Sequence, residues 1–292
     1  MTKVLVTGGA GTLGSHVVRK LLANGYTVRI MSRKSQPADL LPGTEWAQAD
    51  LESGQGIAEA VSGVDVIVHA ASNTLPLKSK RTQRVDREGT RTMLEKARAA
   101  HVAHIVYISI VGIDRVPLPY YHYKLATEEV LKNGGIPWSI LRATQFHSLI
   151  DLILQVATKL PPVALLPTDF RCQPVDEDEV AARLCEIVAA GPAKANAYWP
   201  DMGGPAVLTL GEMARLWLAQ RHLQRIIIPL YLPGKAADGF RQGGNTCPEH
   251  AFGRVTWETW LKDTDSYDRL LILKAFVARK LARSARRFRS RS

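Results

Sequence analysis

A glycine-rich turn near the amino terminus joins a strand-like run to a helix-like run. The sequence KVLVT is followed by GGAGTLG and then by a stretch whose apolar residues recur at helical spacing. In such a unit Gly8 makes the tight turn, Gly11 lets a diphosphate approach the backbone, and Gly14 lets the helix pack closely on the strand. The unpaired N–H groups of the helix start then face the phosphates. The alternative is a tight loop that binds nothing. The predicted phosphate-binding residues are Gly8, Gly11, Thr12, Leu13 and Gly14.

The end of the second predicted strand, residues 26–31, bears on which dinucleotide binds. Folds that bind NAD usually carry Asp or Glu there to hold the ribose 2′-hydroxyl, whereas an arginine suits the 2′-phosphate of NADP. Here the chain has Ser32, Arg33 and Lys34 and no acidic residue. We therefore expect NADP(H) to be preferred. NAD(H) is the alternative if Arg33 and Lys34 merely solvate the strand end.

Strand-like and helix-like segments alternate through the first half of the chain. Apolar or β-branched runs predict further strands at residues 45–48, 64–71, 104–110 and 136–143, and helical spacing predicts helices at 86–100 and 119–131. This alternation predicts an α/β fold with a doubly wound parallel sheet. Ligands of such sheets bind outside the carboxyl ends of the strands.

Two of these strand ends add residues to the predicted cofactor site. Asp50 and Leu51 follow the third strand, where an adenine ring would lie and where a carboxylate can accept a hydrogen bond from the adenine amino group. Ala70 and Ala71 close the fourth strand, and their small side chains would let a cofactor pass close above it.

Three polar residues near the end of the fifth strand suggest acid–base chemistry. Ser109 stands at that end, and Tyr120 and Lys124 lie one helical turn apart in the segment that follows. A nearby ammonium group favours the phenolate and so would lower the pKa of the tyrosine. Tyr120 is then a proton donor or acceptor for a carbonyl or alcohol, with Ser109 holding the same oxygen. Two alternatives stay open: Tyr121 or Tyr123 takes this place, or the tyrosines only pack on the sheet.

The regular alternation stops near residue 149. We expect residues 1–149 to form the cofactor-binding core, residues 150–265 a smaller, less regular substrate region, and residues 266–292 a basic tail. Capping-box patterns predict helices that begin at residues 176–179 and 209–212 in the second part. At the mouth of the expected cleft stand Arg142, Gln145, Phe146 and His147, and His147 is interpreted as a lining residue rather than a catalyst.

The charge of the chain is uneven. Of the net charge of +11, residues 266–292 carry +8, with nine Lys and Arg against one Asp, which leaves the body nearly neutral. Apolar residues at helical spacing in this tail would suit contact with an anionic membrane surface, and a solvated tail is the alternative. Nucleic acid is not an expected partner, because the body carries no motif for it.

The cysteines and the amino terminus bear on the compartment. The 3 cysteines show no metal-ligand spacing, so we expect no metal site and a reduced, cytoplasmic setting. Because the first strand begins at residue 3, no secretion signal is expected ahead of it. The apolar runs are too short to cross a bilayer.

Taken together, these motifs resemble those of the atypical short-chain dehydrogenase/reductases, in particular the NmrA-like NAD(P)H-binding group. The resemblance rests on TGGAGTLG at 7–14, DL at 50–51, VDREGT at 85–90, SIVGID at 109–114, YYHYK at 120–124, LRATQF at 141–146 and GRVTWETW at 253–260. It implies a Rossmann sheet with a small carboxyl-terminal substrate region and a nicotinamide cofactor on the glycines. In active members it also implies a catalytic group matching Ser109, Tyr120 and Lys124. Asp86 departs from the asparagine that many extended members carry.

Two functions follow from the motifs and the resemblance. The first is an NAD(P)H-dependent oxidoreductase that acts on a carbonyl or quinone-like small molecule, with Lys124 also orienting the cofactor ribose. The second is a regulator or assembly factor that binds NAD(P)H without turning over a substrate, as some NmrA-like proteins do. Both need the glycine turn, and only the first needs the tyrosine.

Overall fold

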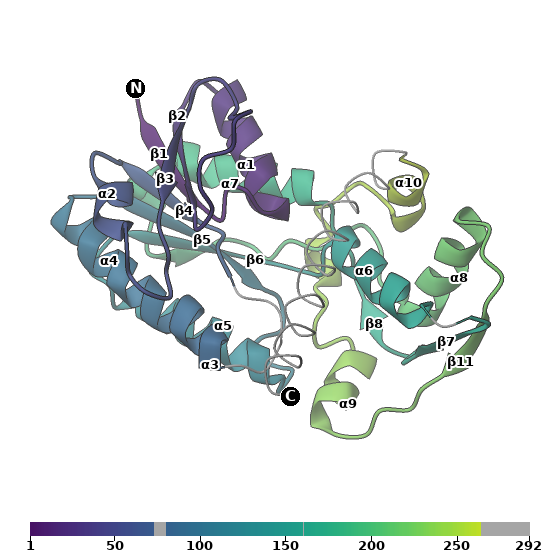
Figure 1. The fold of residues 1–292 in the computed structure, drawn as a ribbon. Helices are drawn as coiled ribbons and strands as arrows, with labels where there is room; N and C mark the ends of the chain where they lie inside the picture. Colours follow the sequence, from purple (N-terminus) through teal and green to yellow (C-terminus); the bar gives the residue numbers. More distant parts are fainter. Residues whose placement is uncertain (73–79, 160, 264–292) are drawn as a thin grey trace, which may run out of the picture.

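Seven parallel strands form the central sheet of the protein in a computed structural model, which describes residues 1–72, 80–159 and 161–263 (Figure 1). The strand order is β3-β2-β1-β4-β5-β6-β9, so the order reverses beside β1 as in doubly wound folds. The predicted fold class is confirmed. The strands are β1 Lys3–Thr7, β2 Thr27–Ser32, β3 Thr44–Gln48, β4 Val66–His69, β5 His104–Ile110, β6 Trp138–Ala143 and β9 Ala197–Tyr198.

Helices cover both faces of this sheet, which is why its inner strands are continuous apolar runs. In β1, Val4 and Val6 point into one core and Leu5 into the other, and all three are fully buried. The first face is covered by α1 (Thr12–Ala23) and α7 (Glu177–Ala190). The second is covered by α2 (Ile57–Val61), α4 (Gly89–Ala99) and α5 (Pro119–Lys132).

Two elements from the second half of the sequence belong to this sheet. β9 extends it next to β6, and α7 packs against α1 and the central strands. The sequence boundary at residues 149/150 therefore does not separate the two parts in space. The sequence pattern missed β9 because it is only 2 residues long. The predicted helix at 86–100 begins earlier, with α3 (Lys80–Thr82) and the π-helical turn η1 (Gln83–Glu88) ahead of α4.

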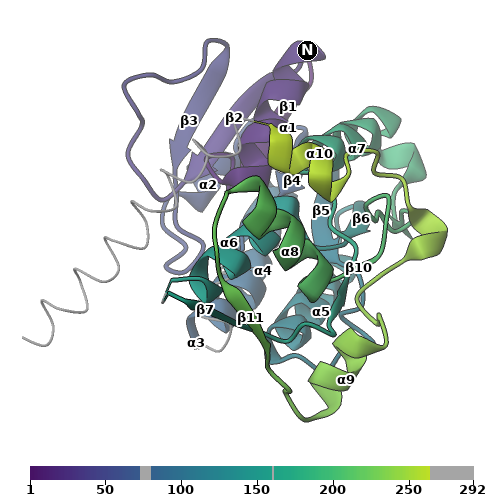
Figure 2. The same ribbon diagram turned by 90° about the vertical axis from the view of Figure 1, so that its right-hand side faces the viewer.

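The remaining elements form a second, smaller part with its own core (Figure 2). That core brings together Leu154, Met213, Trp217 and Trp257. It contains two small sheets, β7 with β11 in parallel and β8 with β10 antiparallel. The elements are α6 His147–Ala157, β7 Val163–Leu166, β8 Arg171–Cys172, β10 Leu208–Thr209, α8 Leu210–Gln220, β11 Ile226–Pro229, α9 Lys235–Arg241, η3 Pro248–His250 and α10 Trp257–Lys262. The 3-10 turn η2 (Pro192–Lys194) connects α7 with β9 of the main sheet.

One of the two predicted capping boxes is complete. At α8 the Thr209 hydroxyl accepts a hydrogen bond from the backbone N–H of Glu212. In return, the Glu212 carboxylate accepts one from the backbone N–H of Thr209. At α7 the Asp176 side chain caps the helix, but the Glu179 carboxylate accepts instead from the backbone N–H of Arg254, 2.8 Å away. Glu179 thus ties the end of the chain to α7.

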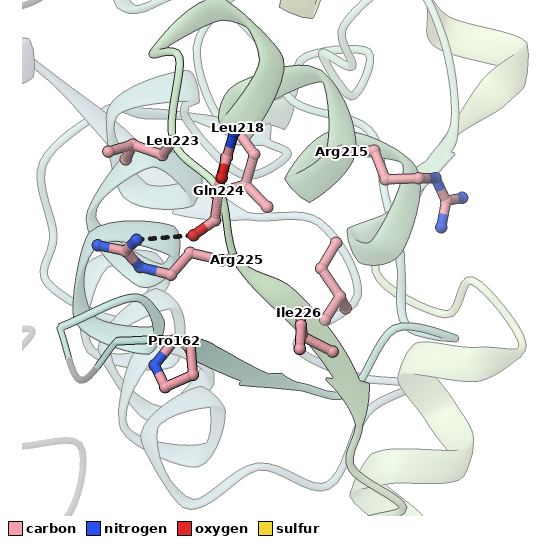
Figure 3. Close-up of a pocket in the computed structure, with 8 residues that line it drawn as sticks. Pro162, Arg215, Leu218, Leu223, Gln224, Arg225 and Ile226 are labelled. Carbon is pink, nitrogen blue, oxygen red and sulfur yellow. Dashed lines mark hydrogen bonds between the residues drawn. The ribbon is translucent and has the colours of Figure 1, made fainter.

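An open groove of about 610 Å³ lies between α8 and β11 (Figure 3). Its walls are largely aliphatic, and Arg215 and Arg225 lie on opposite sides of it. None of its lining residues belongs to the predicted cofactor site. Among the described residues no helix is long and apolar enough to span a membrane. The predicted tail, residues 266–292, lies outside the described residues.

Candidate functional site

The glycine turn has the tight geometry that the sequence predicts. Gly8 has φ +67°, a conformation that suits glycine. A Cβ atom at Gly14 would lie 2.2 Å from the Gly8 carbonyl oxygen, so only glycine lets α1 approach the turn this closely. Among the described residues, a Cβ atom at Gly11 would meet only the Gly8 carbonyl oxygen, at 3.0 Å, and the residue is exposed. The backbone at Gly11 therefore stays open to a ligand.

The start of α1 fits a diphosphate. Gly11 is the N-cap residue, and no side chain within the described part of the chain caps the helix. The first turn holds no acidic residue, so the positive end of the helix dipole is not neutralised. Thr12 is exposed at the opening, while Leu13 is buried and anchors the helix in the core. The residues present thus fit the phosphates of a dinucleotide, with Leu13 acting through packing.

The predicted adenine and ribose residues differ in their surroundings. Arg33 is exposed at the end of β2, and within the described residues its side chain makes no hydrogen bond or salt bridge. Asp50 is half-buried, and its carboxylate accepts from the backbone N–H of Glu52 at 2.9 Å. Leu51 is buried in the second core, where it packs against Gly89. Arg33 and Asp50 can reach a ligand, whereas Leu51 shapes the turn from below.

Ala70 and Ala71 meet the glycine turn itself. A Cβ atom at Gly8 would lie 3.0 Å from the Ala71 Cα atom. The Ala71 N–H donates to the Thr7 hydroxyl at 3.1 Å, which joins the ends of β1 and β4. The small residues at 70 and 71 therefore allow these two strand ends to approach each other, in addition to their expected contact with a cofactor.

Tyr120 begins a hydrogen-bonded chain that the sequence analysis did not foresee. Its hydroxyl oxygen lies 2.8 Å from the Ser72 hydroxyl, and Ser72 donates to the Asp86 carboxylate at 3.1 Å. Because the single Ser72 proton goes to Asp86, the phenol must donate to Ser72. Burial, with the Asp86 charge, raises the pKa of Tyr120 well above its usual value. This is opposite to the lowering expected from Lys124, and the phenol stays protonated at neutral pH.

Lys124 lies one turn further along α5 and points into the protein. Its ammonium group donates to the Ile108 carbonyl oxygen at 2.9 Å and lies 4.1 Å from the centre of the Tyr107 ring. Burial lowers its pKa to about 8, against the opposing charges of Asp86 and Glu128. In this structure Lys124 therefore supports the end of β5.

Ser109 stands at the carboxyl end of β5, as predicted, but apart from the other two. Its side chain is buried, and its hydroxyl makes no hydrogen bond to any described residue. The structure thus links Tyr120 with Ser72 and Asp86 through hydrogen bonds, whereas Lys124 donates to the backbone of β5 and interacts with Asp86 through its charge. The two alternative tyrosines also differ: Tyr121 is buried against Phe240, and Tyr123 is half-buried.

Sequence reasoning missed Ser72 and Asp86, although signals for both were present. Ser72 follows Ala71 directly at the end of β4, where the strand-end rule would place it near a ligand. Asp86 is the position at which the chain departs from the asparagine of many extended relatives. Its carboxylate is buried, in the π-helical turn η1. A charged group at such a depth is retained only where it has partners.

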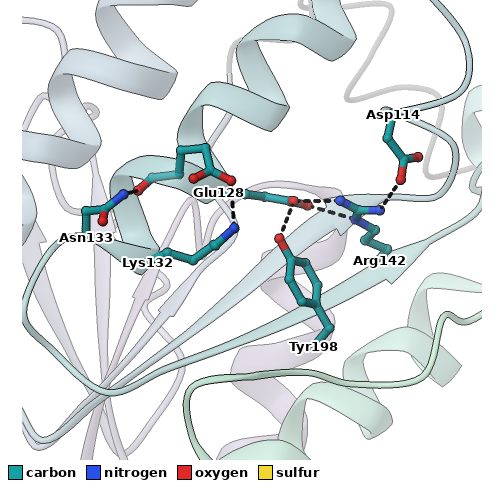
Figure 4. Close-up of polar contacts among 7 residues, drawn as sticks. Asp114, Glu128, Lys132, Asn133, Arg142 and Tyr198 are labelled. Carbon is teal, nitrogen blue, oxygen red and sulfur yellow. Dashed lines mark hydrogen bonds and ion pairs between the residues drawn. The ribbon is translucent and has the colours of Figure 1, made fainter.

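Arg142 does not line a cleft. Its guanidinium forms two hydrogen bonds with the fully buried Glu128 carboxylate, at 3.0 and 2.7 Å, and a third with Asp114 at 3.1 Å (Figure 4). The Tyr198 hydroxyl also donates to Glu128, at 2.9 Å. Although burial opposes it, these carboxylates raise the pKa of Arg142. Arg142 therefore joins β6 to α5.

The other residues expected at the mouth of the cleft are also packed. The Gln145 amide bonds to the backbone of Asn245 and Gln173, and Phe146 packs against the first core. His147 is wholly buried and stacks on Trp257 and Trp260, so its interpretation as a lining residue is wrong. The ring lies beside two tryptophans of the C-terminal core, which come from a segment more than 100 residues further along the sequence.

Comparison with known proteins identifies the family. Residues 8–156, about half of the chain, match the family model described as NAD(P)H-binding. The chain belongs to this NAD(P)H-binding family. The match contains the glycine turn and the Tyr120–Ser72–Asp86 chain, and it confirms the resemblance stated from the sequence.

Relatives of this NAD(P)H-binding protein include both assembly factors and a reductase. It is 28% identical over 187 residues to the photosystem II assembly factor Ycf39 of Trieres chinensis, covering 62% of this chain and 58% of that protein. It is 27% identical over 235 residues to a chloroplastic divinyl chlorophyllide a 8-vinyl-reductase of Oryza sativa subsp. indica, covering 73% and 58%. The chain thus spans less than two thirds of the length of these relatives.

The solved structures share the fold. An NADPH-dependent quinone oxidoreductase from Escherichia coli, solved with NADPH, superposes with a TM-score of 0.73 at 20% identity. The superposition covers 88% of this chain and 98% of that one. Identity at this level shows the fold alone.

Proposed function

We propose that this protein is an NAD(P)H-dependent reductase that acts on a carbonyl or quinone-like small molecule. Support comes from the membership of the NAD(P)H-binding family and from the likeness to a vinyl reductase. The observation that carries the proposal is the Tyr120 phenol, held at 2.8 Å from Ser72 at the ligand edge of the sheet. The small molecule is the expected partner.

The binding half of the proposal uses the residues around the glycine turn. Gly8, Gly11, Thr12 and Gly14 would hold the diphosphate on the start of α1. Arg33 would hold the 2′-phosphate of NADP(H), which we propose as the preferred cofactor. Bound NAD(P)H supplies a hydride for the reduction.

The phenol would supply the proton of the reduction. The hydride would go to the substrate carbon and the phenol proton to the substrate oxygen, and water would then reprotonate the phenolate. Burial and the Asp86 charge raise the pKa of Tyr120, so its hydroxyl carries this proton at neutral pH. Because the hydroxyl donates to Ser72 in the structure, it would turn from Ser72 to the substrate oxygen. Ser109, whose buried hydroxyl has no partner among the described residues, is the proposed second contact of that oxygen.

The test is a panel of carbonyls and quinones with NADPH, comparing wild type with Tyr120→Phe and Tyr121→Phe. The two tyrosines are adjacent and equally buried, so Tyr121→Phe is a matched control. We expect Tyr120→Phe to lower turnover by about 100-fold or more, and Tyr121→Phe to leave it nearly unchanged. Equal turnover in wild type and Tyr120→Phe would remove Tyr120 from the reaction, and a loss confined to Tyr121→Phe would move the role to its neighbour.

The choice of cofactor has its own test. Arg33→Ala should weaken NADPH binding about tenfold, because a charge-assisted hydrogen bond to the 2′-phosphate is lost, and should leave NADH binding nearly unchanged. Arg91→Ala, which removes an exposed arginine of α4, is the control. Equal affinity of the wild type for NADPH and NADH, measured by calorimetry, would contradict the preference.

A second function is favoured by a specific observation. Lys124 bonds to the Ile108 carbonyl oxygen, and the pKa of Tyr120 is raised, so the group expected of active members is not assembled around one oxygen. Together with the likeness to an assembly factor, this supports a protein that binds NAD(P)H without turnover. Tight NADPH binding by the wild type with no turnover on any substrate of the panel would select this function.

A further inference from the structure

The small sheet of β7 and β11 carries an apolar face that no described residue covers. In the parallel register Ile228 lies beside Leu165 and Ile226 beside Val163, so these side chains share one face. Leu165 is 52% exposed and Ile226 65%. On the other face Leu166 and Ile227 pack into the C-terminal core. Figure 1 places this sheet at the margin of the molecule, at the opposite end from β3.

Further apolar side chains continue this face beyond the strand. Leu230 and Leu232 are exposed, and Tyr231 between them is 71% exposed. One face of the Tyr231 ring is covered by the Arg241 guanidinium, 4.3 Å from the ring centre. Monomeric soluble proteins rarely leave a contiguous surface of this kind open, and those that do commonly use it to bind a partner or a membrane.

The charges around the face are mainly basic. The two stretches that form the small sheet and its neighbours, residues 152–168 and 213–237, contain no Asp or Glu and contain Lys159, Arg215, Arg221, Arg225 and Lys235. Asp169 and Asp238, which follow these stretches, both pair with Arg241, and Arg221 pairs with Asp151. The other four basic residues make no salt bridge with any described residue, so the apolar surface lies in a stretch of chain with an excess of positive charge.

The groove beside the face also combines aliphatic walls with basic side chains. Leu218, Leu223 and Ile226 give it aliphatic walls. The guanidinium of Arg225 donates to the Gln224 carbonyl oxygen on one side, and that of Arg215 lies on the other (Figure 3). Long basic side chains keep their charge in water while their stems cover apolar surface, which is how such residues sit at a lipid interface.

We propose that the β7/β11 face and its adjoining groove bind the surface of an anionic lipid bilayer. The aliphatic side chains and Tyr231 would enter the boundary between headgroups and acyl chains, and Arg215, Arg225, Lys159 and Lys235 would meet the lipid phosphates. Charge argues against two other occupants of this face. A second copy of the chain would place the same basic groups against each other. Residues 266–292 carry a net charge of +8, so the basic groups around the face would repel them.

The experiment is flotation of the full chain with vesicles of phosphatidylcholine alone or mixed with phosphatidylglycerol. Wild type should float with the mixed vesicles and much less with phosphatidylcholine. Ile226→Glu should lower the bound fraction at least about tenfold, because the carboxylate opposes both insertion and the lipid charge. Arg225→Gln should lower it about fivefold, in a salt-dependent way. Leu41→Glu, at an exposed leucine of the loop before β3, is the matched control.

Three results would overturn the proposal. One is that the wild type does not float with either kind of vesicle. Another is that Ile226→Glu and Leu41→Glu float equally, which would assign any binding to other residues of the chain. The third is that Ile226→Glu turns a dimer into a monomer in sedimentation equilibrium without changing flotation, which would assign the face to a second copy.

Discussion

Two buried histidines, one in the main sheet and one in the C-terminal part, have opposite surroundings. The His69 ring stacks on Tyr107, and its two nitrogens lie 2.7 Å from the Thr7 hydroxyl and 2.9 Å from the Thr90 hydroxyl. The His147 ring stacks on two tryptophans, and neither nitrogen has a partner among the described residues. Burial lowers the pKa of both rings to about 3.

The hydrogen bonds of His69 fix its tautomer. Thr90 donates its only hydroxyl proton to the Asp86 carbonyl oxygen at 2.6 Å, so His69 Nε2 must carry a proton and donate to Thr90. Nδ1 then accepts from Thr7. Every polar atom of this group is satisfied with the ring neutral. Lys124 further opposes protonation.

The two histidines show that burial is compensated differently at the two sites. In the main sheet the His69 ring and the Glu128 carboxylate have hydrogen-bond partners, although the Ser109 hydroxyl has none among the described residues. In the C-terminal part the His147 ring has no such partner among the described residues, and an apolar face lies exposed. We therefore expect the C-terminal part to open locally at a lower free energy than the main sheet. Three substitutions and one pH profile test this difference.

The largest effect should come from Arg142→Leu in the main sheet. It leaves the fully buried Glu128 carboxylate without its cation, which should lower the free energy of unfolding by about 3–5 kcal/mol. Urea unfolding at neutral pH measures this. Lys132→Met, which breaks an exposed pair with Glu129, should cost less than about 1 kcal/mol. If both variants lost the same free energy of unfolding, the buried Arg142–Glu128 pair would contribute no more to stability than the exposed pair.

Next in size is His69→Leu. It leaves the Thr7 hydroxyl without an acceptor and the Thr90 hydroxyl without a donor, which should cost about 2–3 kcal/mol in the same urea experiment. Adding Thr90→Val to His69→Leu should cost less than the two single losses together, because the partners belong to one network. Additive losses would argue against the network.

His147→Phe should act in the opposite direction. The phenyl ring keeps the stacking on Trp257 and Trp260 and removes two unsatisfied nitrogens, so we expect a gain of about 1–2 kcal/mol. His147→Leu is a second variant that also removes the two nitrogens, and it shows whether stability rises or falls if the phenylalanine side chain proves too large for the site. A loss of stability in both variants would mean that the histidine nitrogens contribute to folding.

Measured per pH unit, the smallest expected effect is the slope of stability against pH. The unfolded state protonates His147 near pH 6.5, while the folded state resists protonation until about pH 3. The stability due to the neutral ring is thus fully present above pH 6.5 and is lost as the pH falls toward 3. Between about pH 6 and 4, wild type should lose up to roughly 1.4 kcal/mol per pH unit relative to His147→Phe. His69 contributes to both proteins and cancels, so parallel profiles would refute this account.

Much of the main sheet was predictable from sequence because its signals are local. The runs that became β1, β4 and β5 are apolar and end at turn residues, and the glycine spacing specified the turn before α1. The C-terminal part gave weaker signals, because strands of 2 or 4 residues are too short to show an alternating apolar pattern. Long-range pairs, such as Glu179 with Arg254, depend on tertiary structure alone.

The site was predictable by position more than by chemistry. The glycine pattern predicted Gly11, the strand-end rule predicted Ser109, and the helical spacing to Lys124 singled out Tyr120. Spacing on α5 suggested that Lys124 acts on Tyr120, but the lysine turns toward Ile108 and Tyr107 because the interior offers it a carbonyl oxygen and an aromatic face. Burial and Asp86 then determine the direction of the tyrosine pKa. Neither effect can be read from residue spacing.

Calorimetric titration of NADPH into the full chain tests the central claim, that the glycine turn holds the diphosphate of a dinucleotide. We expect one binding site with micromolar affinity in the wild type. In Gly11→Val, whose side chain would stand above the turn, binding should be lost. Because its Cβ atom would meet the Gly8 carbonyl oxygen at 3.0 Å, the melting temperature is measured as well, to check that the variant still folds. If neither NADPH nor NADH binds the wild type at millimolar concentration, the claim is contradicted.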